Sequence, residues 1–445
     1  MVKVRKQEHM VKSLMIKSVI AGALFVVPAV ANFTVFEGHF GAVAFAESTK
    51  ATTKVPAMRD RVYTQLARAQ KLSDNGDKAA GFEVLDEVKK KINSLNSYEK
   101  AMLWNFYGFM YYAQEDVPNA IKSFESVVAQ DAIPETLRVA TLYSLAQLAM
   151  QSQDYAKSLD FLNQWQKANN KPLVANQHIL FAQVYYQNKQ FGESIEHINN
   201  AVDMAEAKNE LPKEHWLILQ RAAYYELKQP ENVTKVIEKL VKLYEKPQYW
   251  IQLAGMYGEI GQEKKQLGAM ETAWQAGYIT KPGDIVMLAQ LYLYQQLPYK
   301  AAKVLDDAIA MGTVVPEEKH YLLISQAYIQ AREDEKAIPV LKKASEIAEH
   351  GKFDAQLAQT YLNTEKWQAA VDYANKAIAR GKLDNEGNML LVLGMAHFNL
   401  QQFDKSLTAF EQAQGIKSAE KMAKQWHRYV KKEQGYQEKL AMLND

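Results

Sequence analysis

Apolar, aromatic and small residues recur along this chain about every 36 residues, at the same positions of each unit. In the unit that begins at Ala101, large apolar residues stand at positions 4, 7, 11, 24 and 27, and small residues at positions 8 and 20. Units beginning at Pro247 and Gly387 repeat much of this pattern. Positions 4, 7, 8 and 11 share one helix face, because residues three or four apart are neighbours on a helix. The pattern therefore predicts repeated helix–turn–helix units.

Small residues mark the predicted close approach of the two helices in each unit. Position 8 of the first helix is occupied by Gly108, Ala146, Ala182, Ala254, Ala289, Ser325, Ala358 and Gly394. Position 20, on the second helix, is occupied by Ala80, Ala120, Ser158, Ser194, Ala301, Ala337, Ala370 and Ser406. Short side chains at both positions allow the two helices to pack closely, so the pattern favours paired helices over isolated ones.

Ten units begin near residues 61, 101, 139, 175, 213, 247, 282, 318, 351 and 387. The first and fifth match least well, and the longer spacing early in the chain predicts longer helices or turns there. Prolines fall at the junctions between units or at the expected starts of second helices, where a missing N–H is tolerated. Residues 418–440 have helical spacing and predict a closing helix. The predicted organisation is a leader over 1–46, a lead-in over 47–60, repeats over 61–417, and a capping helix and tail over 418–445.

The repeated residues resemble the tetratricopeptide repeat, whose pattern is Trp, Leu-Gly, Tyr, Ala, Phe, Ala and Pro at these positions. The resemblance implies an all-α, right-handed superhelical solenoid of about ten units. Such an array is one elongated body in which each repeat packs only on its neighbours.

The first 46 residues have a different character. Five basic residues (Lys3, Arg5, Lys6, Lys12 and Lys17) precede an apolar run over 19–30. Ala44-Phe45-Ala46 then gives a small-x-small signature, so we expect a signal peptide cleaved between Ala46 and Glu47. Cleavage after Ala31 and retention as a membrane anchor are the alternatives, although the run is short for a span of about 20 residues. We therefore expect the cleaved chain to be located in the periplasm.

Charge and cysteine content narrow the function classes. The chain has 53 Lys+Arg and 51 Asp+Glu, and removing residues 1–46 leaves 48 and 49. No basic stripe with interleaved aromatic residues predicts a nucleic-acid partner. The chain has no cysteine, so it has neither a disulfide nor a cysteine for a lipid anchor.

No catalytic, cofactor or metal motif stands out. The nine histidines form no metal-binding pair, and no phosphate-binding glycine loop or nucleophile elbow is present. We therefore expect a non-enzyme with no cofactor and no small-molecule substrate.

The candidate site is the concave face lined by first helices. Glutamines follow the small residue at position 9 of five units: Gln147, Gln183, Gln290, Gln326 and Gln359. Aromatic residues stand at position 12: Tyr112, Tyr186, Tyr224 and Phe398. Because an amide side chain both donates and accepts hydrogen bonds, a row of glutamines suits an extended peptide backbone. The alternative is that these are ordinary polar residues beside water.

A narrower resemblance concerns the segments over 59–63, 97–108, 246–253 and 255–259. They resemble a family of exported Gram-negative tetratricopeptide proteins encoded beside TonB, ExbB and ExbD. That resemblance implies an accessory to TonB-dependent uptake across the outer membrane, for example of iron–siderophore complexes, with a TonB, ExbB or ExbD component as partner. The alternative is a scaffold for polysaccharide or outer-membrane protein assembly.

Overall fold

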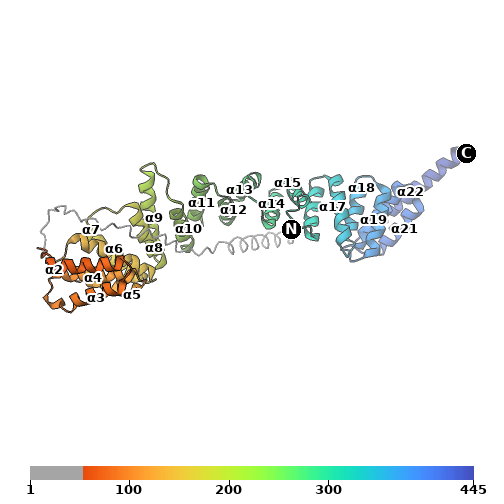
Figure 1. Cartoon of the computed structure of the whole chain (residues 1–445). Coiled ribbons are helices and arrows are strands. Elements are labelled where there is room, and N and C mark those ends of the chain that lie inside the picture. Colours follow the sequence, from red (N-terminus) through yellow and green to blue (C-terminus); the bar gives the residue numbers. More distant parts are fainter. Residues whose placement is uncertain (1–53, 445) are drawn as a thin grey trace. The chain divides into compact units, whose positions relative to one another are not determined.

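The computed structural model describes residues 54–444. The predicted signal peptide and its cleavage site at Ala46 and Glu47 lie outside the described residues. The described part is all-helical, with ten consecutive pairs of α-helices and one closing helix (Figure 1). The all-α architecture of paired helices expected from the sequence is thus confirmed.

First helices of the pairs are α2 (Asp60–Asp74), α4 (Ser97–Tyr112), α6 (Glu135–Gln151), α8 (Ala175–Gln187), α10 (Glu214–Glu226), α12 (Pro247–Glu259), α14 (Pro282–Tyr294), α16 (Glu318–Gln330), α18 (Lys352–Asn363) and α20 (Glu386–Asn399). Second helices are α3 (Lys78–Lys89), α5 (Val117–Val128), α7 (Tyr155–Asn169), α9 (Phe191–Glu206), α11 (Pro230–Tyr244), α13 (Glu263–Gln275), α15 (Pro298–Ala310), α17 (Asp334–Ile347), α19 (Trp367–Arg380) and α21 (Phe403–Gln414). A 3-10 turn, η1 (Ile92–Ser94), precedes α4, and α22 (Glu420–Asn444) closes the chain. The long early spacing reflects α4 and α6, which have 16 and 17 residues where most later first helices have 13 or 14.

Every first helix ends in the same turn, with one residue in the left-handed region. Glycine occupies this position in the first and sixth repeats, as Gly76 and Gly261. The other eight repeats place a side chain there: Glu115, Gln153, Lys189, Lys228, Gln296, Arg332, Glu365 and Gln401, with φ between 56° and 62°. The next backbone N–H donates to a carbonyl five residues earlier, as from Asp116 to Tyr111 and from Asp154 to Ala149. This hydrogen bond is that of a Schellman turn.

The small residues lie at the helix–helix contact, as expected. A Cβ added to Gly108 would come within 2.6 Å of the Phe124 ring. Ser158 Oγ donates to the Ala146 carbonyl oxygen at 2.7 Å, twelve residues away on the partner helix. In this way a serine at position 20 satisfies its own hydroxyl inside the contact.

The register predicted for the first repeat is one residue too early. Ala80 is only half-buried, whereas Gly81 is buried, and a Cβ on Gly81 would lie 3.0 Å from the Ala69 carbonyl oxygen. Ala69 and Gly81 are therefore the close-packed pair of this repeat. The turn residue Gly76 stands seven residues after Ala69, as Glu115 stands seven after Gly108.

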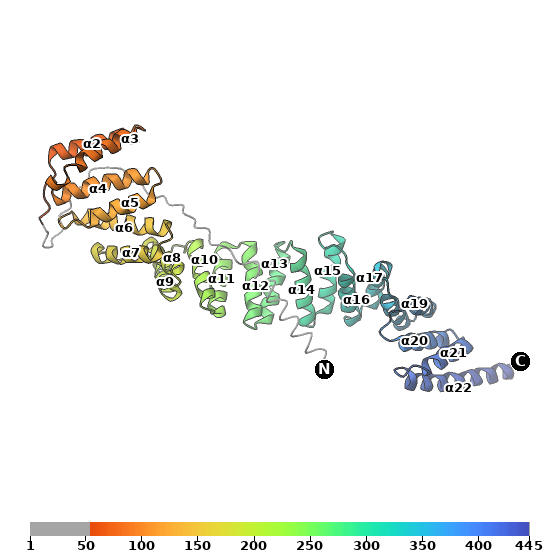
Figure 2. The ribbon, with the colours of Figure 1, turned by 90° about the horizontal axis from the view of Figure 1, so that it is seen from below.

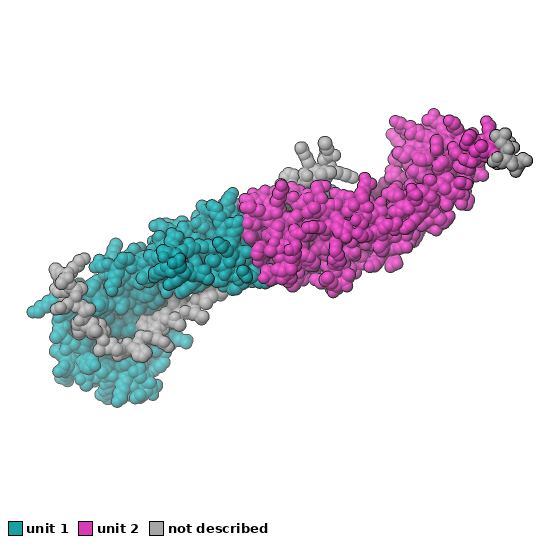
Figure 3. All heavy atoms as spheres, turned by 90° about the horizontal axis from the view of Figure 1, so that it is seen from above, with its two compact units in different colours: residues 1–249 teal, residues 250–445 magenta. Residues whose placement is uncertain are grey.

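The chain divides into two compact units, the first ending at Tyr249 and the second beginning at Trp250, inside α12 (Figure 3). Within each unit the helix pairs stack on their neighbours (Figure 2). The sequence suggested a single elongated body, so the division into units is a refinement that the repeat pattern did not signal.

Neighbouring repeats are joined by polar contacts between residues about one repeat apart. Lys246 Nζ lies 2.6 Å from Glu214 Oε2 in unit 1, and Lys366 Nζ lies 2.8 Å from Glu335 Oε2 in unit 2. The buried Asp354 on α18 joins the same two repeats: its carboxylate accepts from Ser345 Oγ of the preceding repeat at 2.6 Å and from Arg380 Nη1 of its own repeat at 2.8 Å. These contacts add to the apolar packing between repeats.

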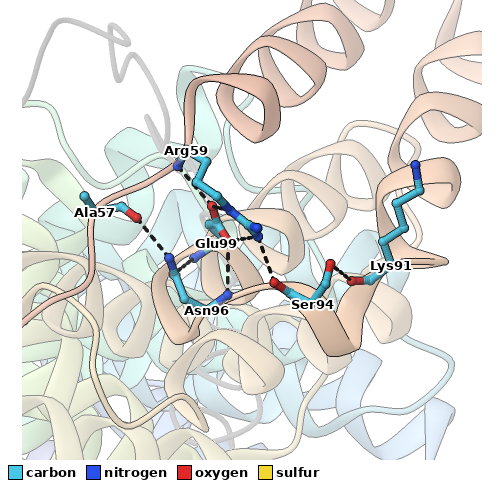
Figure 4. A network of polar contacts seen from close by, with 6 residues as sticks. All are labelled: Ala57, Arg59, Lys91, Ser94, Asn96 and Glu99. Carbon is cyan, nitrogen blue, oxygen red and sulfur yellow. Dashed lines mark hydrogen bonds and ion pairs between the residues drawn. The ribbon is translucent and has the colours of Figure 1, made fainter.

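The segment before α2 is held by a second buried carboxylate, Glu99 in the first turn of α4 (Figure 4). Its oxygens accept from the Arg59 guanidinium at 2.6 and 2.8 Å and from the Arg59 backbone N–H at 3.0 Å. Asn96 and Glu99 also form a capping box, and the Asn96 amide donates to the Ala57 carbonyl oxygen. The arginine contact is the main cause that lowers the pKa of Glu99 to about 2.

Candidate protein-binding faces

We define the first-helix face as positions 9 and 12 of the first helices, counted so that the left-handed turn residue is position 15. Position 8 packs on the second helix and is buried in most repeats. Position 9 is turned toward solvent: Gln326 is exposed although the preceding Ser325 is fully buried. The face is therefore set by helix geometry, because one residue rotates the side chain by about 100°.

In unit 2 three consecutive repeats present Gln290, Gln326 and Gln359, and all three side chains are exposed. Each is followed three residues later by a half-buried aliphatic side chain: Leu293, Ile329 and Leu362. The Gln359 amide donates to Asn363 Oδ1 at 3.0 Å. Within the described part of the chain, Gln290 and Gln326 have no side-chain hydrogen bond, so their amides are open to solvent or a partner.

In unit 1 the face is more aromatic. Gln147 and Gln183 are half-buried, as are Tyr112 and Tyr186 at position 12. The Tyr186 ring packs edge-on against Phe191, with ring centroids 5.4 Å apart. The glutamines predicted as one row thus form a pair in unit 1 and a set of three in unit 2, and each group is considered within its own unit.

The aromatic residue at position 12 of the fifth repeat is Tyr225 and not Tyr224, which was the predicted residue. The turn residue there is Lys228, so position 12 falls three residues earlier, at Tyr225. Tyr225 is 49% exposed, whereas Tyr224 is half-buried. The misassignment arose because this repeat lacks the small residue from which its register was counted.

Arg221 stands at position 8 of the fifth repeat, where most other repeats have glycine, alanine or serine. Burial lowers the pKa of this guanidinium. Burial also raises the pKa of Tyr186; Glu226 raises it further and Arg221 lowers it, which places both charges near the Tyr186 hydroxyl. Behind the tyrosines of this face, the fifth repeat therefore has a half-buried cation, Arg221, and Glu226 brings a negative charge near the same hydroxyl.

Phe398, the last predicted aromatic residue, lies in an aromatic cluster with the closing helix. Its ring centroid is 5.4 Å from that of Tyr429 and 6.1 Å from that of Trp426, both on α22. It also packs edge-on against Phe403 at 6.0 Å. Phe398 therefore packs between the last repeat and α22.

Across 54–444 no three His, Cys, Asp or Glu side chains are grouped so that they would hold a metal ion. Among the same helices, none combines the length and apolar character that a bilayer crossing requires.

Family models of the tetratricopeptide repeat match residues 110–172, 320–350 and 356–420. No curated protein sequence matches the chain. Among solved structures, a tetratricopeptide protein from Parabacteroides merdae is 14% identical, with coverage of 56% of this chain and 94% of its own and a TM-score of 0.33. YrrB, described as having an unusual peptide-binding site, is 11% identical, with coverage of 43% and 96% and a TM-score of 0.33. The Cut9–Hcn1 hetero-tetramer of the APC/C is 12% identical, with coverage of 85% of this chain and 91% of its own and a TM-score of 0.28.

The matched segments lie in both units, and within them the helix pairs and small contact residues are those of the repeat. Each matched segment includes at least one close-contact residue, among them Ala146, Ser325 and Ala358. The three matched segments are therefore tetratricopeptide repeats, a type of repeat that binds protein partners and serves as a scaffold.

Proposed function

We propose that this protein is an exported adaptor whose first-helix faces hold an extended segment of a partner protein. The observation that carries the proposal is the run of exposed Gln290, Gln326 and Gln359 on three consecutive repeats of unit 2. The three glutamines stand at the same position of α14, α16 and α18, so an extended backbone that crosses these helices meets one amide in each repeat.

The flanking side chains suit the same ligand. Leu293, Ile329 and Leu362 lie one helical turn from the glutamines and are only half-buried, so they offer apolar contacts between the amides. A segment with alternating apolar side chains would bury them there while its backbone bonds to the glutamines. In unit 1, Tyr112, Tyr186 and Tyr225 offer aromatic contact area, which is enriched at binding hot spots.

The cellular role we propose is an accessory to TonB-dependent transport across the outer membrane, with a TonB, ExbB or ExbD component as partner. Two sequence features support it: the basic and apolar N-terminal pattern that predicts export, and the resemblance of the segments over 59–63, 97–108, 246–253 and 255–259 to the TonB-linked family. The proposed location is the periplasm.

The experiment is a pull-down from envelope extracts with the tagged full-length protein, read by mass spectrometry. The test variant carries Gln290→Ala, Gln326→Ala and Gln359→Ala. The matched control changes three exposed glutamines on second helices of the same unit, Gln275, Gln368 and Gln412, to Ala. The proposal predicts that TonB, ExbB or ExbD is recovered by the wild type and the control and is lost in the test variant. Recovery of envelope-assembly proteins without them would overturn the TonB role and favour the scaffold alternative.

A further inference from the structure

The closing helix α22 carries an apolar stripe that stays largely exposed within the described part of the chain, although the ring of one member, Tyr429, lies against Phe398. Met422, Tyr429 and Tyr436 recur every seven residues, and Leu440 follows four residues after the last. Their exposed fractions are 51%, 53%, 57% and 36%. Residues seven apart and four apart share one side of a helix, so these four side chains form a continuous seam of the kind that packs on another helix.

The seam is centred away from the side by which α22 packs on the last repeat, and Tyr429 lies where the two sides meet, 5.4 Å from the Phe398 ring. Ala423 and Val430 are fully buried against the array, and the Trp426 ring stacks on Phe410 with centroids 5.9 Å apart. In unit 2, α22 has its contacts with α20 and α21. Residues 431–440 are exposed or half-buried throughout, so the second half of the seam is carried by a helix that extends past the packed part (Figure 2).

A row of cations borders the seam on the side away from the array: Lys421, Arg428, Lys432 and Lys439, at spacings of seven, four and seven residues. At 3.6 residues per turn these four share a side of the helix next to the apolar stripe. All four are exposed, and no carboxylate within residues 54–440 pairs with them. The other border of the seam is formed by Glu433 and Gln437, which bond to each other.

We propose that this seam binds an amphipathic helix of a partner protein that carries acidic residues beside its apolar face. An apolar seam with a charged border on one side selects a partner helix by charge, as in coiled coils. A second copy of α22 brings another basic row and no acidic row to complement the first. A helix lying on an anionic bilayer would favour cations on both borders of its apolar face, whereas here one border is Glu433 and Gln437.

The test uses the full-length protein and a fluorescent synthetic helix with leucines at seam spacing flanked by glutamates, read by anisotropy. The test variant carries Arg428→Glu, Lys432→Glu and Lys439→Glu, and the control is Lys431→Glu, an exposed cation on the side opposite the seam. We expect the charge reversal to raise the Kd at least tenfold and the control to change it less than twofold. A second peptide with lysines in place of the glutamates should bind the reversed variant and not the wild type.

Three results would overturn the proposal: equal affinity for both peptides, binding to phosphatidylglycerol vesicles with none to the acidic helix, and self-association through α22 in sedimentation. Tyr436→Ser tests the contribution of the apolar seam, since it should weaken binding of the acidic peptide without altering the helicity of the protein. The site is independent of the first-helix face, so the glutamine variants should bind the acidic helix normally.

Discussion

Arg59 and Glu99 join the segment before the first helix to the second repeat, through an ion pair of 2.6 Å on a fully buried carboxylate. The arginine backbone and side chain both donate to the same glutamate, so the lead-in is fixed at two points. A buried carboxylate without its cation is costly, which makes this pair a sensitive reporter of the N-terminal repeats.

The first prediction concerns this pair. Arg59→Ala should destabilise the first repeats, because it leaves the buried Glu99 carboxylate without its cation and without the two hydrogen bonds that it accepts from the arginine side chain. Chemical denaturation and hydrogen exchange of α2 and α4 measure the loss. Arg61→Ala, an exposed arginine two residues later, is the control and should be neutral. Because the pKa of Glu99 is lowered to about 2, the contribution of the pair is complete above the unfolded value of about 4.5 and is lost as pH falls below it.

The second prediction concerns the dependence of stability on pH near the pKa of histidine. His178 and His197 lie with their Nδ1 atoms 2.9 Å apart, and His197 stacks on Phe181. Burial is the main cause that lowers the pKa of both, to about 4 for His197. The unfolded chain therefore binds more protons below pH 6.5, so stability should be complete above that pH and fall by about 2 kcal/mol from pH 7 to pH 5.

Thermal melts of the wild type and His197→Phe between pH 7.5 and 5 test this pair. The variant keeps the aromatic stack and removes one titrating group, so the decrease in Tm should be smaller. An identical pH dependence in both proteins would show that other groups cause it.

The third prediction concerns the close helix contacts. Gly394→Val should destabilise unit 2 by about 1–3 kcal/mol, because a Cβ there would lie 2.5 Å from the Phe410 ring and overpacking costs this much. Gly268→Ala is the control: this helical glycine has no atom within 4 Å of an added Cβ, so helix propensity should raise stability by about 0.5–1 kcal/mol. Urea denaturation measures both. Equal effects of the two substitutions would mean that the contact at Gly394 can relax.

Most of the fold could be predicted from the repeated positions. Two helices that cross closely need short side chains at the crossing, and the same crossing recurs along the chain. The register failed where a repeat lacks that marker. Arg221 replaces the small residue in the fifth repeat, so position 12 was assigned to Tyr224 when it belongs to Tyr225. The first repeat has small residues at both contact positions, Ala69 and Gly81, but the pattern predicted Ala80, one residue earlier, for the second of them. The left-handed turn residue identifies the register in all ten repeats. Eight of them have a residue other than glycine there, so the sequence does not mark the turn in those repeats.

The candidate site was predicted less completely. The exposure of Gln290, Gln326 and Gln359 follows from helix periodicity, whereas the packing of Phe398 on α22 depends on how the closing helix docks. The half-buried aliphatic residues beside the glutamines were also missed, although their three-residue offset is visible in the sequence. Binding of a peptide by the first-helix face stays a prediction.

The fourth prediction separates binding from folding at the glutamines. Changing Gln290, Gln326 and Gln359 to Ala should leave helicity and Tm nearly unchanged, because the side chains are exposed and alanine favours helix. Affinity for the partner segment should fall by about 2 kcal/mol, since each lost hydrogen bond contributes about 0.5–1.5 kcal/mol. Circular dichroism and calorimetric titration measure the two effects. A lowered Tm with unchanged affinity would assign these residues to structure.

The most direct measurement is site-specific photo-crosslinking in living cells. A photoreactive amino acid placed at Gln326 of the full-length protein reports what touches the first-helix face, and the same group at Gln368, exposed on the second helix of the next repeat, is the control. We expect a specific adduct with a TonB, ExbB or ExbD component from position 326 and none from position 368. Adducts of the same kind from both positions, or none from position 326, would contradict the account.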